Sequence, residues 1–242
     1  MFTMSKHILN KLLLIALLLF TINTLMLAND IGATQEYQSS FINKLTPIIT
    51  QENENISQER RFVEDFFKRY NKEDTSIDAK SFNALLETAK RYKIADIFDK
   101  SEYLLKIDAI PVTLALSQAA LESGWGQSKV AQKSQNYFGQ RKFTEAVDLE
   151  QLNYAKFRGI EEGVKAYMLN LNAHEAYKEF REKRALYAQD GKKINGKIAA
   201  KTLKKYSNDG SAYVKMLSEI INQHFVALDN IKNRPQNVRT IL

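Results

Sequence analysis

The stretch Ile110–Gly126, IPVTLALSQAALESGWG, constrains the fold more than any other part of this chain. Pro111 suits a first helical position, because its fixed φ and missing N–H cost nothing there. Helix-forming residues then continue without a break, and Gly124 follows as a residue that can end a helix in the left-handed conformation. The pattern therefore predicts one central helix around which the rest of the chain is organised.

Glu122 falls in the last turn of this predicted helix, among apolar and small residues. A helix C-terminus carries partial negative charge and burial disfavours a carboxylate, so both effects raise the pKa of a carboxyl there. A carboxylic acid that stays protonated near neutral pH is suited to act as a general acid. Gln118, one turn earlier on the same face, is predicted to hold this carboxyl in place. The alternative from composition alone is a solvated helix-end glutamate beside a core Trp125.

The composition excludes several other chemistries. The chain of 242 residues has no cysteine, which rules out a disulfide framework, a cysteine metal site and a thiol nucleophile. Its three histidines, His7, His174 and His224, do not form a zinc-protease motif. There is no glycine-rich phosphate loop, and we expect neither a metal nor an organic cofactor. The net charge of +7 fits an anionic polymer such as cell wall, but equally a membrane surface or a nucleic acid.

Residues 1–28 have the composition of a secretory signal. Lys6 and Lys11 form a basic start, Leu12–Leu27 is almost entirely apolar, and Ala28 ends the run with a small residue. The apolar run is long for a cleaved signal and short for a membrane span, so an uncleaved anchor is the alternative. In either case we expect the folded part to be exported to the periplasm or cell envelope, with a membrane contact only through this segment.

Helical periodicity covers most of the remaining chain. Residues 29–107 are predicted to form a helical N-terminal extension, residues 108–228 a second helical domain, and residues 229–242 a polar tail. Apolar residues recur at helical spacing in two separate segments of the extension, and Ser57 is a candidate N-cap for the second.

The domain that begins at residue 108 carries the one predicted β element. Gln140–Thr144 and Leu152–Phe157 have strand-like content and are expected to form a small hairpin, with three acidic residues near its tip. On either side of the hairpin the pattern predicts helices over Ser128–Ser134, Ile160–Ala173, Glu175–Tyr187, Lys197–Lys205 and Ser211–Ala227.

Two sequence blocks carry a resemblance to a known family. The run SQAALESGWGQSKVA covers Ser117–Ala131, and NYFGQ follows at Asn136–Gln140. Together they resemble the glucosaminidase family of peptidoglycan hydrolases, glycoside hydrolase family 73, and within it the Bax-like branch. The similarity continues through Phe157–Tyr177 and Lys204–Val214. It implies a mainly α, lysozyme-like α+β domain with a small β-hairpin lobe. Phe41–Phe67 also resembles that branch, so we expect the extension to pack on the domain.

The resemblance implies hydrolysis of β-1,4 bonds of N-acetylglucosamine in peptidoglycan glycan strands. Such cleavage needs a proton for the leaving oxygen and a group that stabilises an oxocarbenium-like centre, usually a second carboxyl. Glu122 matches the family's catalytic glutamate and is the expected general acid. The second carboxyl is expected on the hairpin lobe, where Glu145 is the first choice. Glu150, also a candidate substrate contact, follows closely, and Asp148 is the third acidic residue of the lobe.

Further residues match the family's blocks. Tyr177, in NAHEAY, resembles the family's active-site tyrosine, and the alternative is a core tyrosine with a satisfied hydroxyl. Asn136 and Tyr137 are expected to line the sugar groove. Gln118 is a further candidate substrate contact, and Tyr206 is expected to close one end of the groove.

Two alternatives to a hydrolase remain open, and a third is disfavoured. A wall-binding protein without activity is suggested by the short lobe, which lacks the cysteines associated with the Bax-like branch. A lytic enzyme that uses Glu122 alone is the second. An anchored nucleic-acid-binding protein is suggested only by the positive charge. The chain has no clustered Lys/Arg stripe with interleaved aromatics, so no nucleic-acid partner is expected. The sequence does not determine the oligomeric state.

Overall fold

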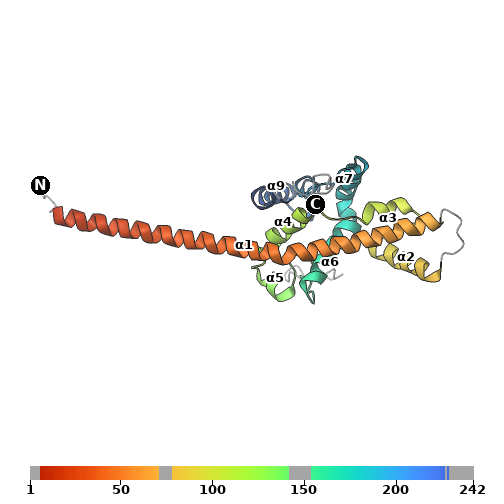
Figure 1. The fold of residues 1–242 in the computed structure, drawn as a ribbon, viewed down its shortest axis with the longest axis horizontal. Helices are drawn as coiled ribbons and strands as arrows, with labels where there is room; N and C mark the ends of the chain where they lie inside the picture. Colours follow the sequence, from red (N-terminus) through yellow and green to blue (C-terminus); the bar gives the residue numbers. More distant parts are fainter. Residues whose placement is uncertain (1–5, 71–77, 142–153, 227, 229–242) are drawn as a thin grey trace, which may run out of the picture. The chain divides into compact units, whose positions relative to one another are not determined.

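The computed structural model describes residues 6–70, 78–141, 154–226 and 228, with the backbone alone for residues 6–33. In these parts the chain is mainly helical, which confirms the predicted mainly α class and is compatible with a lysozyme-like domain (Figure 1). The chain divides into two compact units, residues 1–43 and residues 44–242, and the candidate site belongs to the second. None of the described helices is long and apolar enough to cross a membrane.

The central helix of the second unit is α4, Val112–Ser123, and it forms where the sequence predicts a helix. Its residues from Val112 to Ala120 are all buried, because all of them except Gln118 are apolar or small. Pro111 precedes the first helical residue instead of being that residue. Gly124 ends the helix in the left-handed conformation with a φ of 56°, as predicted. The last turn of α4 therefore carries Glu122.

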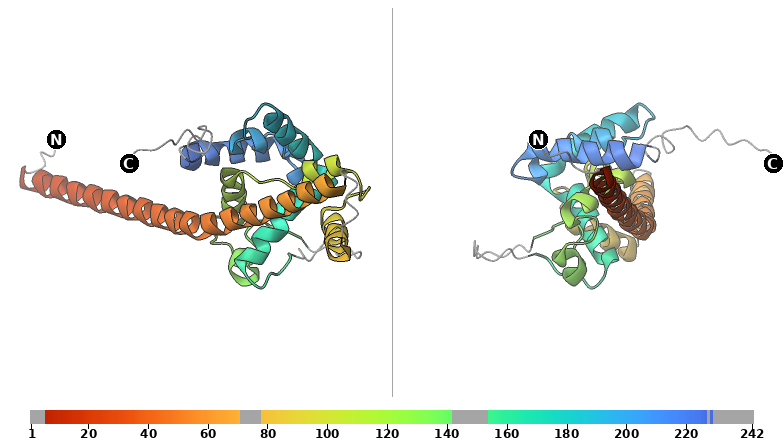
Figure 2. Two further views of the ribbon diagram at one scale, coloured as in Figure 1. Left: turned by 45° about the vertical axis from the view of Figure 1, so that its right-hand side comes forward. Right: turned by 90° about the vertical axis from the view of Figure 1, so that its left-hand side faces the viewer.

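Later segments of the chain surround α4. Three elements pack directly against it: α8 (Gly196–Ala200), α9 (Gly210–Ile220) and the π-helix η3 (Ile221–Phe225) (Figure 1 and Figure 2). The other described elements after α4 are α5 (Lys129–Ser134), α6 (Ile160–Ala173), the short turn η1 (Glu175–Tyr177), α7 (Lys178–Gln189) and the short turn η2 (Lys204–Tyr206).

Most of the predicted helices of this domain are confirmed, with shifts at their ends. Helix α6 has the predicted bounds, and α5 begins after Ser128, whose hydroxyl accepts the N–H of Ala131 at 3.1 Å. The helix predicted over Lys197–Lys205 divides into α8 and η2. The helix predicted over Glu175–Tyr187 begins with the tighter turn η1, because His174 ends α6 in an extended conformation.

The first helix, α1, is longer than the sequence predicts and runs over Lys6–Tyr70. The prediction of two segments with Ser57 as the N-cap of the second is wrong, since the helix is continuous through Pro47 and Ser57. The hydroxyl of Ser57 donates to the carbonyl of Asn53 one turn earlier, at 2.7 Å. A serine inside a helix can satisfy its hydroxyl in this way without capping anything.

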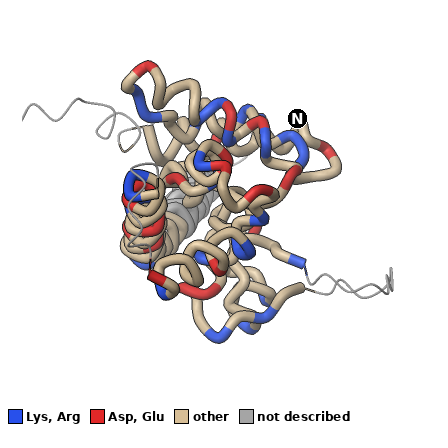
Figure 3. Tube along the Cα trace, turned by 90° about the vertical axis from the view of Figure 1, so that its right-hand side faces the viewer, with Lys and Arg blue, Asp and Glu red and all other residues tan. Residues whose placement is uncertain are grey.

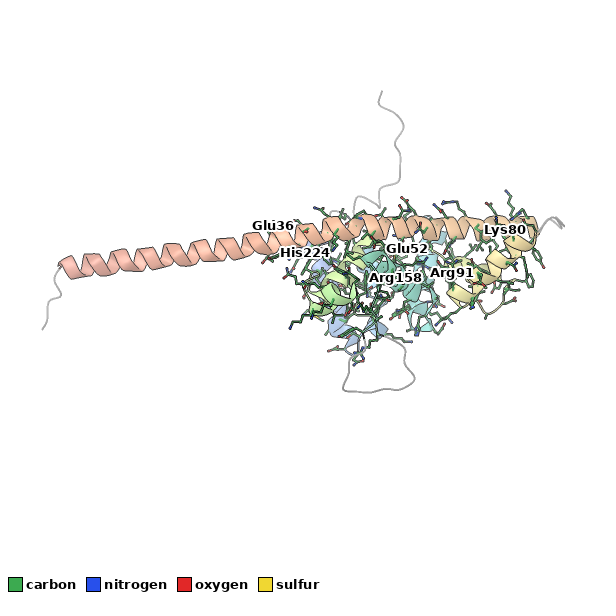
Figure 4. The ribbon with its side chains drawn as sticks, turned by 90° about the horizontal axis from the view of Figure 1, so that it is seen from below. Glu36, Glu52, Lys80, Arg91, Arg158 and His224 are labelled. Carbon is green, nitrogen blue, oxygen red and sulfur yellow. The ribbon has the colours of Figure 1, made fainter. Side chains whose placement is uncertain are left out.

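Residues 44–70 of α1 are bonded to α2 (Ala79–Tyr92). Arg91 of α2, labelled in Figure 4, pairs with the Glu59 carboxylate at 2.5 Å. The hydroxyl of Tyr92 donates to the other oxygen of the same carboxylate at 2.5 Å. One glutamate of α1 therefore holds the last turn of α2.

The same part of α1 also holds α3 (Lys100–Lys106) and the entry to α4. The Arg60 guanidinium donates to the carbonyls of Leu104 and Ile107, at 2.6 and 2.8 Å, and so satisfies free carbonyls at the end of α3. Asn53 bonds to both backbone groups of Ile110, each at 2.8 Å. The extension from residue 44 onward thus lies in one compact unit with the domain that follows it.

The predicted hairpin lobe falls mostly on residues 142–153, which lie outside the described residues, so the lobe stays a prediction. At its base, Arg141 and Tyr154 form an isolated antiparallel bridge. The N–H of Ala155 donates to the carbonyl of Gln140 at 2.8 Å. The chain therefore leaves and re-enters the described domain at adjacent positions.

Candidate active site

Glu122 lies in the last turn of α4 and is half-buried. Burial raises the pKa of its carboxyl, and a hydrogen bond from the Tyr213 hydroxyl acts in the opposite direction. The sequence predicts a raised pKa from burial and from the helix terminus, and in the structure burial is the cause that raises it. A carboxyl in this environment holds its proton to a higher pH than an exposed glutamate does.

The NYFG loop lies directly against this carboxyl. A methyl group placed on Gly139 would come within 2.7 Å of Glu122 Oε2. Gly139 also has a φ of 62°, a conformation that residues with a side chain rarely adopt. The glycine is therefore required twice at this position, once for the turn and once for the close approach.

Four tyrosines from four different elements gather around Glu122. Burial raises the pKa of each, and the negative charge of Glu122 raises it further; they are Tyr167, Tyr177, Tyr206 and Tyr213. The rings of Tyr206 and Tyr213 are stacked with centroids 5.3 Å apart, and those of Tyr177 and Tyr206 lie 5.8 Å apart. All four hydroxyls consequently remain protonated at neutral pH and can donate hydrogen bonds.

A series of hydrogen bonds connects Tyr167 to Glu122 by way of Gln118 and Tyr213. The Tyr167 hydroxyl donates to Gln118 Oε1 at 2.7 Å, and Gln118 Nε2 donates to the Tyr213 hydroxyl at 2.9 Å. Tyr213 in turn bonds to the Glu122 carboxyl. Gln118 is fully buried. It holds Glu122 through Tyr213 rather than directly, and its predicted sugar contact stays a prediction.

Sequence reasoning missed Tyr167 and Tyr213. Both lie inside the blocks that carry the family resemblance, Phe157–Tyr177 and Lys204–Val214, so the blocks themselves were the available signal. Nothing in their local spacing indicates that they meet at Gln118, because that contact joins residues 49 and 95 positions away from it.

The predicted residues Tyr177 and Tyr206 reach the site as buried or half-buried rings. The Tyr177 side chain hydrogen-bonds with Asn170, and Tyr206 donates to the carbonyl of Phe138 at 3.1 Å. Phe138 is itself buried and stacks on Tyr167 with ring centroids 3.8 Å apart. These contacts tie the NYFG loop to the tyrosine cluster.

Asn136 and Tyr137 begin the same loop. Both are buried, and the Asn136 amide donates to the carbonyls of Gln140 and Ala155, at 2.7 and 3.0 Å. Its oxygen accepts the N–H of Gln140 at 3.0 Å. The hydroxyl of Tyr137 accepts a bond from Lys44 at 3.4 Å. These contacts give Asn136 a structural role at the base of the lobe, and the predicted sugar contacts of both residues stay predictions.

Trp125 packs beside the end of α4 with a φ of 57°. Its ring meets His224 edge to face at a centroid distance of 4.8 Å and lies 6.3 Å from Phe225. These contacts give Trp125 a packing role at the end of α4.

The three candidates for the second carboxyl, Glu145, Asp148 and Glu150, lie outside the described residues. Among the residues that are described, no group of histidines and acids could hold a metal ion. In the view of Figure 3, Lys and Arg residues are spread over much of the described chain, as are Asp and Glu residues.

The environment of Glu122 is one in which a carboxylic acid keeps its proton to a higher pH. A half-buried glutamic acid lies in the last turn of the central helix, the Tyr213 hydroxyl donates to it, and the backbone of Gly139 lies against it. Residues 99–225 match the glucosaminidase family, described as mannosyl-glycoprotein endo-beta-N-acetylglucosaminidase. Over 201 residues the chain is 30% identical to protein bax of Escherichia coli (strain K12), a match that covers 78% of this chain and 71% of that protein.

The chain therefore belongs to the glucosaminidase family of glycoside hydrolases and is Bax-like, as its sequence motifs predict. No solved structure matches it.

Proposed function

We propose that this protein is a peptidoglycan hydrolase that cleaves β-1,4 bonds of N-acetylglucosamine, with Glu122 as the general acid. The observation that carries this proposal is the Glu122 carboxyl, whose pKa is raised by burial and which is reached by a phenol donor. A general acid must be protonated in the enzyme–substrate complex and must tolerate the charge left behind, and this environment serves both needs. Membership of the glucosaminidase family supports the substrate class.

In the proposed reaction, Glu122 donates its proton to the leaving glycosidic oxygen. As the bond breaks, a carboxylate on the opposite side of the sugar stabilises the oxocarbenium-like centre, and Glu145 is our first choice for it. Water then bonds to the anomeric carbon and gives up a proton to a carboxylate, which completes the hydrolysis. Tyr177 and Tyr206 lie close enough to Glu122 to interact with its charge, and we assign them contacts with the sugar at that end of the groove. The composition of residues 1–28 supports an action outside the cytoplasm.

Digestion of purified sacculi tests the proposal. Wild-type protein should release soluble fragments whose new reducing end, identified by mass spectrometry, is N-acetylglucosamine. Glu122→Gln should lose turnover by a factor of about 10²–10⁴, the usual contribution of a general acid, while it still binds sacculi. Glu87→Gln, which changes an exposed glutamate of α2 in the same way, is the matched control and should digest at the wild-type rate.

Other products would replace the proposal with a specific alternative. An anhydro-sugar end would indicate a lytic reaction, and a new N-acetylmuramic acid reducing end would place the cut at the other bond. Binding without digestion by the wild-type protein would indicate a wall-binding protein, and near-wild-type digestion by Glu122→Gln would remove Glu122 from its role.

A further inference from the structure

The Tyr167 side chain is buried completely, so its hydroxyl hydrogen has to find a partner within the protein. That partner is Gln118 Oε1, at 2.7 Å. Stacking against Phe138, with an angle of 9° between the two rings, keeps the Tyr167 ring in this position. The Tyr167 hydroxyl hydrogen is thereby directed toward Gln118.

The Gln118 amide is oriented by this contact. With its oxygen on Tyr167, its nitrogen faces Tyr213 and donates to that hydroxyl at 2.9 Å. The reversed amide would place its nitrogen on Tyr167 and its oxygen on Tyr213. The buried Tyr167 hydrogen would then have no acceptor on Gln118, and an unsatisfied buried donor is unfavourable. The observed orientation is the one in which the Tyr167 hydroxyl hydrogen has an acceptor on Gln118.

Tyr213 receives a hydrogen bond from Gln118, so its own hydroxyl hydrogen is left for Glu122. The side chain is 3% exposed, and its ring is stacked on that of Tyr206 at an angle of 11°. Tyr206 is anchored in turn by the carbonyl of Phe138. Tyr213 is therefore fixed as a donor to the carboxyl and is not free to turn toward another partner.

We propose that Tyr167, Gln118 and Tyr213 form a one-way chain of hydrogen bonds that positions Glu122 and stabilises the negative charge it acquires when it gives up its proton. The inference rests on the proposed function, because it requires Glu122 to be the general acid. These three side chains transfer no proton. The Glu122 proton goes to the leaving oxygen, and Tyr167, Gln118 and Tyr213 keep their hydrogens. Tyr213 is a positioning residue in this scheme.

The surroundings of Glu122 make such a donor necessary. The titratable groups that interact with it are the four tyrosines, from α6, η1, η2 and α9. In the described part of the chain, no Lys, Arg or His contributes to the shift of its pKa, and the Tyr213 hydrogen bond is what opposes the effect of burial. Without this donor the carboxylate left after proton transfer would be buried with little compensation.

The test is the pH profile of kcat/KM for Tyr213→Phe in the full chain, with solubilised glycan strands as substrate. The alkaline limb of the profile reports the pKa of the general acid. Because the variant loses a donor to the carboxylate, this limb should move upward by about one pH unit, the size expected for one hydrogen bond to a charged group. The maximal rate should fall roughly tenfold, with KM close to the wild-type value.

Tyr103→Phe is the matched control. Tyr103 is also fully buried, and its hydroxyl has no hydrogen-bond partner among the described residues. The control removes the same atom from a buried tyrosine outside the site, so it should leave the pH profile unchanged. A merely structural role of Tyr213 would lower activity without moving the alkaline limb upward.

A second variant covers the case in which Tyr213→Phe does not fold. Tyr167→Phe keeps the stacked ring but removes the hydrogen that orients the Gln118 amide, and it should move the limb in the same direction by a smaller amount. An unchanged or lowered limb in either folded variant overturns the inference.

A titration of the Glu122 carboxyl by carbon NMR separates this inference from the proposed function, because it needs no turnover. A higher Glu122 pKa in Tyr213→Phe than in the wild type supports the proposed hydrogen-bond series even if the wild type proves inactive. An equal pKa overturns the inference even if Glu122→Gln is inactive, as the proposed function requires.

Discussion

At the scale of single residues, two opposing effects act on the pKa of Glu122. Burial favours its protonated form, whereas the Tyr213 hydroxyl favours its carboxylate. The net direction is a raised pKa, so the folded state binds the Glu122 proton more tightly than the unfolded chain does. Functional sites often hold a group in an environment that the fold alone would not select.

The raised pKa predicts a pH-dependent gain in stability for Glu122→Gln. The contribution of the protonated carboxyl is fully present below its unfolded pKa and is lost as the pH rises through its folded pKa. The wild type therefore loses stability over that interval, and the variant does not. Urea unfolding at pH 4 and pH 8 should show that the free energy of unfolding of Glu122→Gln, relative to that of the wild type, is larger at pH 8 than at pH 4. Glu87→Gln, on an exposed surface, should show no such gain, and an equal pattern in both variants would contradict the prediction.

A second residue-scale prediction concerns Gly139. In Gly139→Ala the new methyl group would meet Glu122 Oε2, so the carboxyl must move and activity should fall at least tenfold. Gly191→Ala is the matched control, because Gly191 has a φ of 66° and nothing within 4 Å of the added atom. Both variants should lose about 1 kcal/mol of stability from the left-handed backbone. If both also lose activity equally, the contact with Glu122 is not the cause.

At the scale of elements, the site depends on helix ends tied down by side chains from distant segments. Arg184 of α7 is buried and donates to carbonyls of Leu105 and Asp108 at 3.0 and 2.9 Å, just before α4 begins. Burial lowers the pKa of this guanidinium to about 10, and the nearby Asp108 acts in the opposite direction. The guanidinium remains charged at neutral pH, so it can satisfy the free carbonyls that follow α3.

The hairpin lobe is the element on which the second carboxyl is predicted to lie. Glu145→Gln should lower turnover clearly, but less than Glu122→Gln, with binding to sacculi little changed. The triple change of Glu145, Asp148 and Glu150 to amides is the decisive variant, measured by reducing-end release from sacculi. Full activity in that protein would mean that no lobe carboxylate takes part, and Tyr177 should then be the most sensitive position after Glu122.

At the scale of the whole molecule, the family match begins at residue 99, whereas the compact unit begins at residue 44. The part of α1 within this unit places six large apolar side chains in the interior; they are Leu45, Ile49, Ile56, Val63, Phe66 and Phe67. Asn53 and Arg60 bond to the backbone that leads into α4. The residues before the family match are therefore part of the folded unit that carries the site.

This packing predicts the outcome of two truncations. A chain of residues 99–242 should fail to fold, because each large side chain lost from the interior contributes about 2 kcal/mol and whole domains are stable by only about 5–15 kcal/mol. A chain of residues 29–242 is the control and should be soluble and monodisperse, since it lacks only the predicted export segment. Circular dichroism and gel filtration would measure both, and a cooperative thermal transition of residues 99–242 would contradict the prediction.

The sequence by itself determined the features that depend on local signals. The central helix and its end at Gly124 follow from an unbroken helix-forming run and a glycine free to adopt a positive φ. Glu122 could be singled out because its position in that helix and the motif around it lie within a few residues. The bounds of α6 have the same local origin.

Only the tertiary structure decided which distant residues meet Glu122. Tyr167 and Tyr213 reach Gln118 across 49 and 95 positions, and no local pattern encodes such a distance. The continuity of α1 through Ser57 also follows from packing, because the apolar side chains on one face of this helix are buried against residues far along the chain. Helix spacing and caps depend on residues that are close in sequence. The burial that raises the pKa of Glu122, and the Tyr213 hydrogen bond that opposes it, exist only after separate helices have packed together.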